Sequence, residues 1–424
     1  MKKIASVFTG LAKVDENLVG TAVIYKKIAE LLSKKDYKVN LVVPDDKRLI
    51  GLGRNIEFFV YNEKNNKKLI SNSDIVVFGA HPPIRPMLHA YGRKKRIITY
   101  LWSIAPIGSL DFQGHSRGLN EYIVSLYNLT LLLSDKIFCR DETAKKIILG
   151  SFASLGRMSV GNYNLDRSFD SLIEEAPFGI EKKIPVHKKN VYRDVLPGVK
   201  KDDFLILWNG GLWNRNDGQV LIRAMGLLKK YNKFKLIFQG YKHPDPACKI
   251  TSEAKKVIGL AKKMGLKDKT VFFIDDWVSH NEKGNYLTEC DLGVATCQRV
   301  ADAMYLLKTR VYDYIWAGMP TVISDCDSLA PLISKNGLGL VCKTGDHKDL
   351  AEKIFEIYNN KVLKRKIEKN IYQYRKEINW TKTLEPISRY LEDRSAIKTL
   401  SKNLAFTNDL ISSFKKIIDK HEKK

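Results

Sequence analysis

The sequence predicts an α/β protein with two doubly wound domains and additional helices at its C-terminal end. Short, continuous apolar segments alternate with segments of helical period on both sides of residues 183–203. Apolar strands that alternate with helices are typical of parallel sheets covered by helices on both faces. The length of 424 residues agrees with more than one domain, because a single core rarely grows beyond roughly 250–300 residues.

The N-terminal domain is expected at residues 1–182. Its apolar segments predict strands at 4–8, 39–43, 75–78, 97–101 and 136–139. Residues 22–35 have helical period and residues 141–149 have an acidic first turn, so both are expected to be helices. Gly20 ends the loop between the first strand and the first helix, where the backbone could approach a ligand. The loop has no GxGxxG motif and therefore lacks a dinucleotide-binding fingerprint.

Residues 183–203 are expected to be a linker, and residues 204–378 are expected to form the second domain. The linker segment is rich in lysine, contains Pro185 and the pair Pro197-Gly198, and shows little periodicity. After it, apolar segments predict strands at 204–208, 235–239, 271–274, 292–295, 321–324 and 339–342. Helical period appears at 219–230, 252–264 and 347–359. A glycine-containing loop, 209–218, follows the first of these strands.

Residues 379–424 are expected to be helices that pack back on the N-terminal domain. Six apolar residues of this tail form one stripe, at spacings of three, four or seven: Ile397, Leu400, Leu404, Ile411, Phe414 and Ile418. Residues 394–424 carry eight basic and three acidic residues. A basic amphipathic helix can alternatively lie on an anionic membrane surface, so that partner is kept as a second interpretation of the tail.

The net charge of +25 is compatible with an anionic partner, and a plain compositional bias toward lysine explains it equally well. The 72 basic residues outnumber the 47 acidic ones, and nucleic acid, an anionic membrane and anionic small substrates could each explain the excess. No nucleic-acid-binding module and no basic run interleaved with aromatic residues is present, so nucleic acid is not expected as a partner.

The cysteines and the apolar segments favour a cytoplasmic protein, with the inner face of the plasma membrane as a candidate contact. The six cysteines show no CxxC pairing and no histidine at metal-ligand spacing, which predicts free thiols and no metal site. Lys13 and Asp15 interrupt the first apolar run, so it is expected to be a strand and not a signal peptide. No segment reaches the ~18 apolar residues of a transmembrane helix.

The segment 302–324 combines charged residues with a helix start. Asp313 lies on a short predicted helix that Gly318 and Pro320 end, and residues 321–324 follow as a strand. Lys308 and Arg310 lie at the start of that helix. This arrangement suits a phosphate at the helix N-terminus and a sugar hydroxyl on the carboxylate. The alternative is an ordinary amphipathic helix of an α/β domain.

Motifs in the second domain resemble those of GT-B glycosyltransferases of the family-four retaining type. More narrowly, they are similar to a bacterial branch associated with surface-polysaccharide and antibiotic-sugar biosynthesis. The matching segments are PFGIE at 177–181, LWNGGLWNRND at 207–217, VLIRAM at 220–225, HPDP at 243–246, VFFIDDWV at 271–278, NYLTECDLGVAT at 285–296, TRVYDYIWAGMPTVIS at 309–324 and GLGLVCKTGD at 337–346. The resemblance implies two Rossmann-like domains that face a cleft.

The family commonly has two glutamates, of which the second binds the ribose of the donor. Asp313 stands at the place of the second glutamate, and a carboxylate can accept hydrogen bonds from both hydroxyls of a ribose. Tyr305 stands at the place of the first. Asp302 is the nearest acid, so the resemblance makes Asp302 the candidate for contact with the donor sugar. His81, in FGAHPP, resembles a residue of the N-terminal domain that faces this sugar; a capped turn before Pro82 is the alternative.

Many family members hold the diphosphate with an arginine and a lysine that this sequence lacks. Gly211 and Asn216 stand at those two places, and Arg215 is adjacent to the second. We expect Lys308, Thr309 and Arg310 at the helix start to supply the missing positive field. Gly20 and Gly211 would let the backbone approach the phosphates closely.

The resemblance implies a hexosyltransferase-like, metal-independent enzyme that needs no cofactor besides its nucleoside-diphosphate sugar. The acceptor would be a saccharide or a lipid-linked saccharide, bound by the N-terminal domain, in surface polysaccharide or glycoconjugate biosynthesis. The missing arginine, lysine and first glutamate leave one alternative open, a catalytically weak partner or scaffold protein of a glycosylation system. A basic nucleic-acid-binding protein is the remote alternative.

Overall fold

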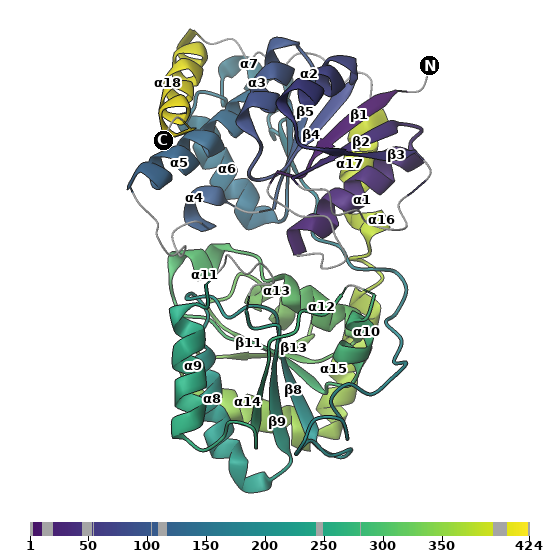
Figure 1. The fold of residues 1–424 in the computed structure, drawn as a ribbon, viewed down its shortest axis with the longest axis vertical. Helices are drawn as coiled ribbons and strands as arrows, with labels where there is room; N and C mark the ends of the chain where they lie inside the picture. Colours follow the sequence, from purple (N-terminus) through teal and green to yellow (C-terminus); the bar gives the residue numbers. More distant parts are fainter. Residues whose placement is uncertain are drawn as a thin grey trace. The chain divides into compact units, whose positions relative to one another are not determined.

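The computed structural model describes residues 3–10, 20–44, 53, 55–102, 104–108, 117–242, 249–279, 281–392 and 405–422. The chain divides into two compact units (Figure 1). Unit 1 contains residues 1–178 together with 380–424, and unit 2 contains residues 179–379. Each unit is an α/β domain around its own parallel sheet.

Unit 1 contains a seven-stranded sheet in the order β3-β2-β1-β4-β5-β6-β7, and every pairing is parallel. Its strands are β1 (Ile4–Phe8), β2 (Lys38–Val43), β3 (Ile56–Val60), β4 (Ile75–Phe78), β5 (Arg96–Leu101), β6 (Lys136–Cys139) and β7 (Ile173–Glu175). Its helices are α1 (Gly20–Lys34), α2 (Glu63–Asn72), α3 (Ile84–Gly92), α4 (Ala105–Gly108), α5 (Arg117–Leu133), α6 (Glu142–Ser154), α7 (Val160–Leu165), α16 (Trp380–Thr383), α17 (Glu385–Glu392) and α18 (Ala405–Glu422).

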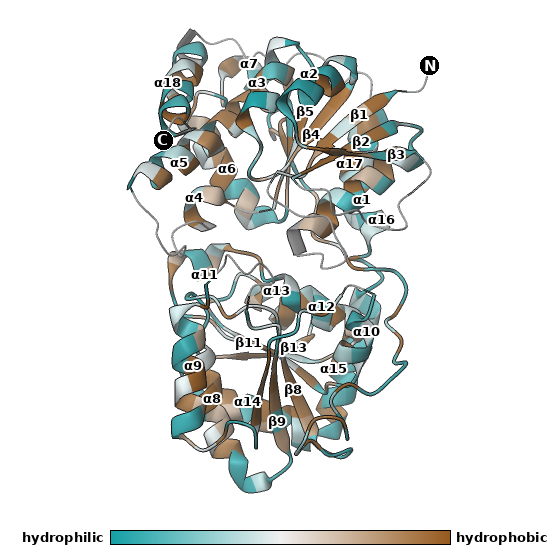
Figure 2. Cartoon of the chain, viewed as in Figure 1, coloured by the Kyte–Doolittle hydropathy of each residue, from teal (hydrophilic) through white to brown (hydrophobic). Residues whose placement is uncertain are grey.

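Unit 2 contains a six-stranded parallel sheet in the order β10-β9-β8-β11-β12-β13. Its strands are β8 (Phe204–Asn209), β9 (Phe234–Gln239), β10 (Val271–Ile274), β11 (Leu292–Ala295), β12 (Thr321–Ser324) and β13 (Gly339–Cys342). Its helices are α8 (Gly218–Leu228), α9 (Ser252–Lys263), α10 (Lys283–Thr288), α11 (Ala301–Tyr305), α12 (Thr309–Ala317), α13 (Ala330–Lys335), α14 (His347–Asn359) and α15 (Lys361–Tyr374), with a 3₁₀ turn at Lys229–Tyr231. In both units the strands are mostly hydrophobic, brown in Figure 2, and the helices around them also contain hydrophilic residues, which are teal.

The expected linker, 183–203, belongs to unit 2 and is held there by side chains. Glu289, at the end of α10, accepts backbone hydrogen bonds from residues 191, 192 and 193 at 2.7–3.1 Å. Tyr192 is fully buried, and its hydroxyl donates to Gln239 Oε1 at 2.9 Å. The lysine-rich composition of this segment therefore does not mark a free connection. The chain passes between the units at 178–179 and again at 379–380.

Helix α18 packs against α5 in unit 1. Ile411 and Phe414 pack against both apolar clusters of this unit, and Ile418 is buried. Lys415 and Lys416 are exposed. The described part of the apolar stripe is thus covered by the protein itself, while Ile397, Leu400 and Leu404 lie outside the described residues. Among the described helices, none combines the length and the low polarity that a membrane span requires.

Candidate functional site

The carboxyl edge of the sheet in unit 2 collects most of the residues that the sequence singles out. All strands of this sheet are parallel, so their carboxyl ends lie at one edge. The loop after β8 carries Gly211 and Arg215, and the segment between β11 and β12 carries Asp302, Lys308, Thr309, Arg310 and Asp313. The fold therefore brings together, within one unit, seven of the nine predicted site residues.

Helix α12 is fixed against the sheet by a buried tyrosine. Tyr314 is fully buried; its hydroxyl donates to the carbonyl of Leu207 at 2.9 Å and accepts from the backbone N–H of Asn209 at 3.0 Å. The ring passes so close to Gly293 that a Cβ there would lie 2.3 Å from it, so only glycine fits in β11. Gly318 ends the helix in a left-handed conformation with φ of 78°. These contacts hold the start of α12 in place at the sheet edge.

Arg310 lies buried under the start of α12. Its guanidinium lies 4.2 Å from the ring centre of Trp208, and Nη2 donates to the carbonyl of Gly211 at 2.7 Å. Nη1 is buried and has no hydrogen-bond partner among the described residues. Burial lowers the pKa of Arg310 to about 10, so the group stays a cation at neutral pH. The described residues therefore leave one N–H of this buried cation unsatisfied.

The carboxylate of Asp302 is buried as well, and one of its two oxygens has no partner among the described residues. Its side chain is 5% exposed, and Oδ1 accepts a hydrogen bond from the N–H of Ala303 at 3.0 Å. Oδ2 is buried without a partner among the described residues. Leaving a buried acceptor unpaired costs about 1–3 kcal/mol, so a donor on a ligand would relieve this cost.

The carboxylate of Asp313 faces two donors from other elements. Asn209 Nδ2, at the end of β8, donates to Oδ2 at 2.8 Å, and Lys283 Nζ, at the start of α10, donates to the same oxygen at 2.8 Å. The side chains of Lys283 and Asp313 are each 22% exposed, so the group can be reached from solvent. Sequence reasoning missed both partners, because no motif marks a strand-terminal asparagine or a lysine in a polar loop.

Lys308 turns toward the interior of unit 2. Its ammonium lies 2.6 Å from Asp327 Oδ2 and donates to the carbonyl of Ala303 at 3.2 Å. The side chains of Lys308 and Asp327 are 6% and 0% exposed. Lys308 therefore neutralises a buried carboxylate, whereas Arg310 keeps one N–H, Nη1, without a partner among the described residues. Thr309 is the first residue of α12, where backbone N–H groups have no partner within the helix.

The loop after β8 folds in a way that explains why glycine stands at position 211. A Cβ on Gly211 would lie 3.1 Å from the ring of Trp213, so an arginine here would have to displace the indole. Asn216 is buried, and its Oδ1 accepts from the N–H of Trp213 at 2.7 Å, which closes the loop. The Arg215 guanidinium lies 5.7 Å from the Trp213 ring centre. Asn216 thus has a structural role, and the Arg215 side chain stays close to the Trp213 ring of the same loop.

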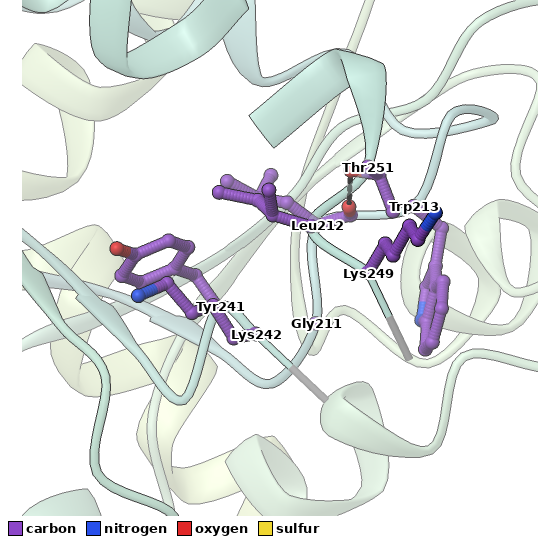
Figure 3. Close-up of a pocket in the computed structure, with 8 residues that line it drawn as sticks. Gly211, Leu212, Trp213, Tyr241, Lys242, Lys249 and Thr251 are labelled. Carbon is purple, nitrogen blue, oxygen red and sulfur yellow. Dashed lines mark hydrogen bonds between the residues drawn. The ribbon is translucent and has the colours of Figure 1, made fainter. Parts of the chain in front are cut away.

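Figure 3 shows a recess beside this loop. Its walls come from the loop after β8, the residues after β9 and the start of α9: Gly211, Leu212, Trp213, Tyr241, Lys242, Lys249, Ile250 and Thr251. Thr251 Oγ1 donates to the carbonyl of Leu212 at 2.5 Å, which joins α9 to the loop. The rings of Trp213 and Tyr241 stand on opposite sides of the recess.

The two remaining predicted residues, Gly20 and His81, belong to unit 1. Gly20 begins α1, and residues 11–19 before it lie outside the described residues. His81 follows β4 and is half-buried, and burial lowers the pKa of its imidazole. The backbone of His81 packs against Gly10, where an added Cβ would lie 2.5 Å from the His81 carbonyl oxygen. Their predicted contacts with phosphate and donor sugar stay predictions. Within the described residues, no group of three or more His, Cys, Asp or Glu side chains could hold a metal ion.

Comparison with known proteins finds a family match within unit 2. Residues 197–374 match the family described as "Glycosyl transferases group 1". None of the curated proteins compared matches the chain.

Solved structures resemble the whole chain at low sequence identity. Sucrose-phosphate synthase from Thermosynechococcus elongatus has a TM-score of 0.67 at 13% identity, over 92% of this chain and 98% of that one. HepE from Anabaena, in complex with UDP and glucose, has a TM-score of 0.68 at 11% identity, over 92% and 99%. WaaG, a glycosyltransferase involved in lipopolysaccharide biosynthesis, has a TM-score of 0.60 at 13% identity, over 92% and 99%. The predicted fold class, α/β with two doubly wound domains as in GT-B proteins, is confirmed.

Proposed function

We propose that this chain is a retaining glycosyltransferase that moves a sugar from a nucleoside-diphosphate sugar to a saccharide or lipid-linked acceptor. One observation carries the proposal: the segment between β11 and β12 holds a buried cation and a buried carboxylate, each with one atom that lacks a partner among the described residues, Arg310 Nη1 and Asp302 Oδ2. A donor with an anionic diphosphate and a hydroxyl-rich sugar offers the acceptor and the hydrogen-bond donor that these two atoms need. The match of residues 197–374 to group 1 glycosyl transferases supports the same assignment.

The diphosphate is assigned to the start of α12. Arg310 Nη1 supplies a charge-assisted hydrogen bond, and the first backbone N–H groups of the helix, from Thr309 onward, add donors and the positive end of the helix dipole. This positive field stabilises the negative charge that develops on the leaving diphosphate, which is usually the largest contribution to such catalysis. The proposed transfer needs no metal ion, because these groups take its place at the diphosphate.

Asp313 and Asp302 are assigned to the sugars of the donor. Asp313, partly exposed one turn into α12, accepts hydrogen bonds from the ribose. Asp302 Oδ2 accepts from a hydroxyl of the transferred sugar, and its charge favours the positive charge that develops at the anomeric carbon. In the transfer step the bond between this carbon and the phosphate oxygen breaks, and the bond to the acceptor oxygen forms on the same face. The acceptor proton goes to the leaving diphosphate.

Unit 1 is assigned to the acceptor, and His81 to contact with the transferred sugar. The lowered pKa of His81 keeps its imidazole neutral at pH 7, so it can donate or accept one hydrogen bond without charge. The net charge of +25 supports an acceptor or membrane surface of negative charge at the cytoplasmic face of the plasma membrane. WaaG acts in lipopolysaccharide biosynthesis, which supports surface polysaccharide or glycoconjugate synthesis as the setting.

A second candidate is a GT-B protein that binds the nucleotide but transfers sugar weakly or not at all. Gly211 and Asn216 stand where many family members hold the diphosphate with side chains, and Lys308 is neutralised by Asp327. These features favour a partner or scaffold role in a glycosylation system. Hydrolysis or transfer from a bound nucleotide sugar separates the candidates, because the scaffold would bind the donor and leave it intact.

Nucleotide binding tests the proposal directly. Thermal shift and saturation-transfer NMR are measured with UDP, GDP, ADP and their sugars, with UDP-glucose first because HepE is solved with it. We expect one nucleotide to stabilise the protein and Asp313→Ala to weaken its binding by roughly 10–100-fold. Asp268→Ala, an exposed carboxylate paired with Lys267, is the matched control and should bind normally. A chain that none of these nucleotides stabilises is not a nucleotide-sugar enzyme.

A further inference from the structure

We propose that Lys283 binds a ribose hydroxyl of the donor together with Asp313, and that the pair selects for a nucleotide that carries this hydroxyl. The inference rests on the proposed function, because it assumes that the ribose lies at Asp313. Lys283 is the first residue of α10, thirty positions before Asp313 in the chain. The two side chains meet at the carboxyl edge of the sheet, where the end of β8 adds Asn209.

The hydrogen bonds to Asp313 are unevenly distributed between its two oxygens. Asn209 Nδ2 and Lys283 Nζ both donate to Oδ2, each at 2.8 Å. Within the described part of the chain, no hydrogen bond reaches Oδ1. A carboxylate oxygen has two lone pairs, so Oδ2 is saturated and Oδ1 is the oxygen that can accept from a ligand. Asp313 therefore offers a ribose one free oxygen, Oδ1, and not the two oxygens of a symmetric bidentate contact.

Lys283 has donors left for that same hydroxyl. An ammonium group carries three N–H bonds, and Asp313 is the hydrogen-bond partner of Lys283 in the described residues. A hydroxyl both donates and accepts. One that donates to Asp313 Oδ1 and accepts from Lys283 Nζ has both of its functions satisfied by charged groups. Such charge-assisted hydrogen bonds are the stronger kind, so this pair discriminates against a nucleotide that lacks the hydroxyl.

Other residues of α10 already hold this helix in place, so Lys283 is not needed for that purpose. Asn285 Oδ1 accepts from the backbone of Lys188 at 2.7 Å, and Leu287 is 1% exposed in the core. Glu289 binds the backbone of residues 191–193. By contrast the Lys283–Asp313 pair is partly exposed, and pairs of that kind add little stability. Loss of the lysine side chain should leave the helix where it is.

The test compares affinity for UDP with affinity for 2′-deoxy-UDP and 3′-deoxy-UDP, by calorimetry on the full chain; the nucleotide preferred in the binding screen replaces UDP if it differs. For the wild type we expect one deoxy analogue to bind roughly 10–100-fold more weakly than UDP. Lys283→Met, which keeps the length and removes the charge, should reduce this ratio to about 3-fold or less. Lys283→Arg, which keeps a cation with several donors, should restore most of the ratio.

Lys189→Met is the matched control. Lys189 lies beside the same helix and pairs with Glu282 at 2.8 Å, away from Asp313, so the deoxy ratio should stay at the wild-type value. Melting temperatures of all variants show whether they fold. An unchanged ratio in Lys283→Met overturns the inference, and so does a ratio that Lys283→Arg fails to restore. If the wild type binds no nucleotide, the proposed function fails; if it binds but Lys283→Met discriminates normally, only the role of Lys283 fails.

Discussion

The two sheets have the same central strand order and different chemistry at their carboxyl ends. Strand β1 pairs with β2 and β4, and β8 pairs in the same way with β9 and β11. Each of these first strands is followed by a glycine with positive φ, 62° at Gly10 and 93° at Gly210. A Cβ on Gly10 would collide with the His81 carbonyl, whereas one on Gly210 would meet no described atom within 4 Å. The turn after the first strand is therefore packed against the backbone of His81 in unit 1, whereas the corresponding turn after β8 in unit 2 has free space beside Gly210.

Two buried arginines show the same contrast at the level of a single side chain. Arg157 in unit 1 donates through Nη1 to three carbonyls, those of Leu131, Leu132 and Ser134, at 2.8–3.1 Å. These contacts satisfy the end of α5. Each arginine also has one buried N–H without a partner among the described residues, Nε of Arg157 and Nη1 of Arg310. Burial lowers the pKa of both to about 10. Three carbonyls at the end of α5 hold Arg157, whereas Arg310 contacts one carbonyl and the Trp208 ring, so the surroundings of the two buried guanidiniums differ.

The largest expected effect concerns the buried pair in unit 2. Lys308→Met should lower the free energy of unfolding by about 3–5 kcal/mol, because it leaves the Asp327 carboxylate buried without its cation. Urea denaturation measures the loss. The double variant Lys308→Met/Asp327→Leu should recover most of it. Weak nucleotide binding by a stable Lys308→Met would instead make Lys308 a phosphate ligand, as the sequence suggests.

The next effect concerns Asp302, the acid that we propose contacts the transferred sugar. Asp302→Asn should lower kcat by roughly 10²–10³-fold, about 2.7–4 kcal/mol, because the carboxylate no longer favours the positive charge at the anomeric carbon. Donor hydrolysis or transfer measures this loss. Tyr305→Phe is the control, since Tyr305 stands at the place of the family's first glutamate. A larger loss in Tyr305→Phe than in Asp302→Asn would move the role to the tyrosine.

Substitution of each arginine should affect a different property, nucleotide binding for Arg310 and stability for Arg157. Arg310→Met should weaken nucleotide binding by about 1.5–3 kcal/mol, the contribution of hydrogen bonds to charged groups. Arg157→Met should lower stability by about 1–3 kcal/mol, because carbonyls at the end of α5 lose their donor, and should bind the nucleotide normally. Calorimetric titration and thermal melting measure the two quantities. Equal nucleotide affinity in both variants would remove the contrast between the units.

The smallest expected effect is a pH dependence that belongs to unit 1. Burial lowers the pKa of His81 below its value in the unfolded chain, about 6.5, so the unfolded state binds the proton at higher pH. The contribution of His81 to stability is therefore complete above about pH 6.5 and is lost as the pH falls through the folded pKa. His81→Gln should show a smaller drop in melting temperature between pH 7 and pH 5 than the wild type. An identical drop in both proteins would contradict the burial of this imidazole.

The sequence predicted those parts of the fold in which each segment is apolar by itself. Strands such as β4, β11 and β12 are buried along their whole length, so a continuous apolar run identifies them. Strand β3 was missed because it is an edge strand whose residues alternate between half-buried and exposed. The backbone of the expected linker is bound by Glu289, almost a hundred residues later in the chain. Burial of this kind leaves no local pattern.

The candidate site shows the same limit. Asp302, Arg310 and Asp313 lie in one segment, so motif and spacing indicate them together. Lys308 and Arg310 cannot be distinguished by sequence, because their different roles depend on Asp327 and on the Trp208 ring. Asn209, at the end of β8, and Lys283, at the start of α10, meet Asp313 only in the folded unit.

Unit 2 is an insertion in the sequence of unit 1, since residues 179–379 interrupt it. The two segments that connect the units lie side by side. The rings of Phe178 and Trp380 are 5.0 Å apart, and the N–H of Ile180 donates to the carbonyl of Ile378 at 2.9 Å. On the ribosome, residues 179–379 are complete before α18 is made, while Ile411 and Phe414 still have to cover α5 and the core of unit 1. Unit 2 can therefore finish folding first, and the earliest residues of the chain belong to the unit that is completed last.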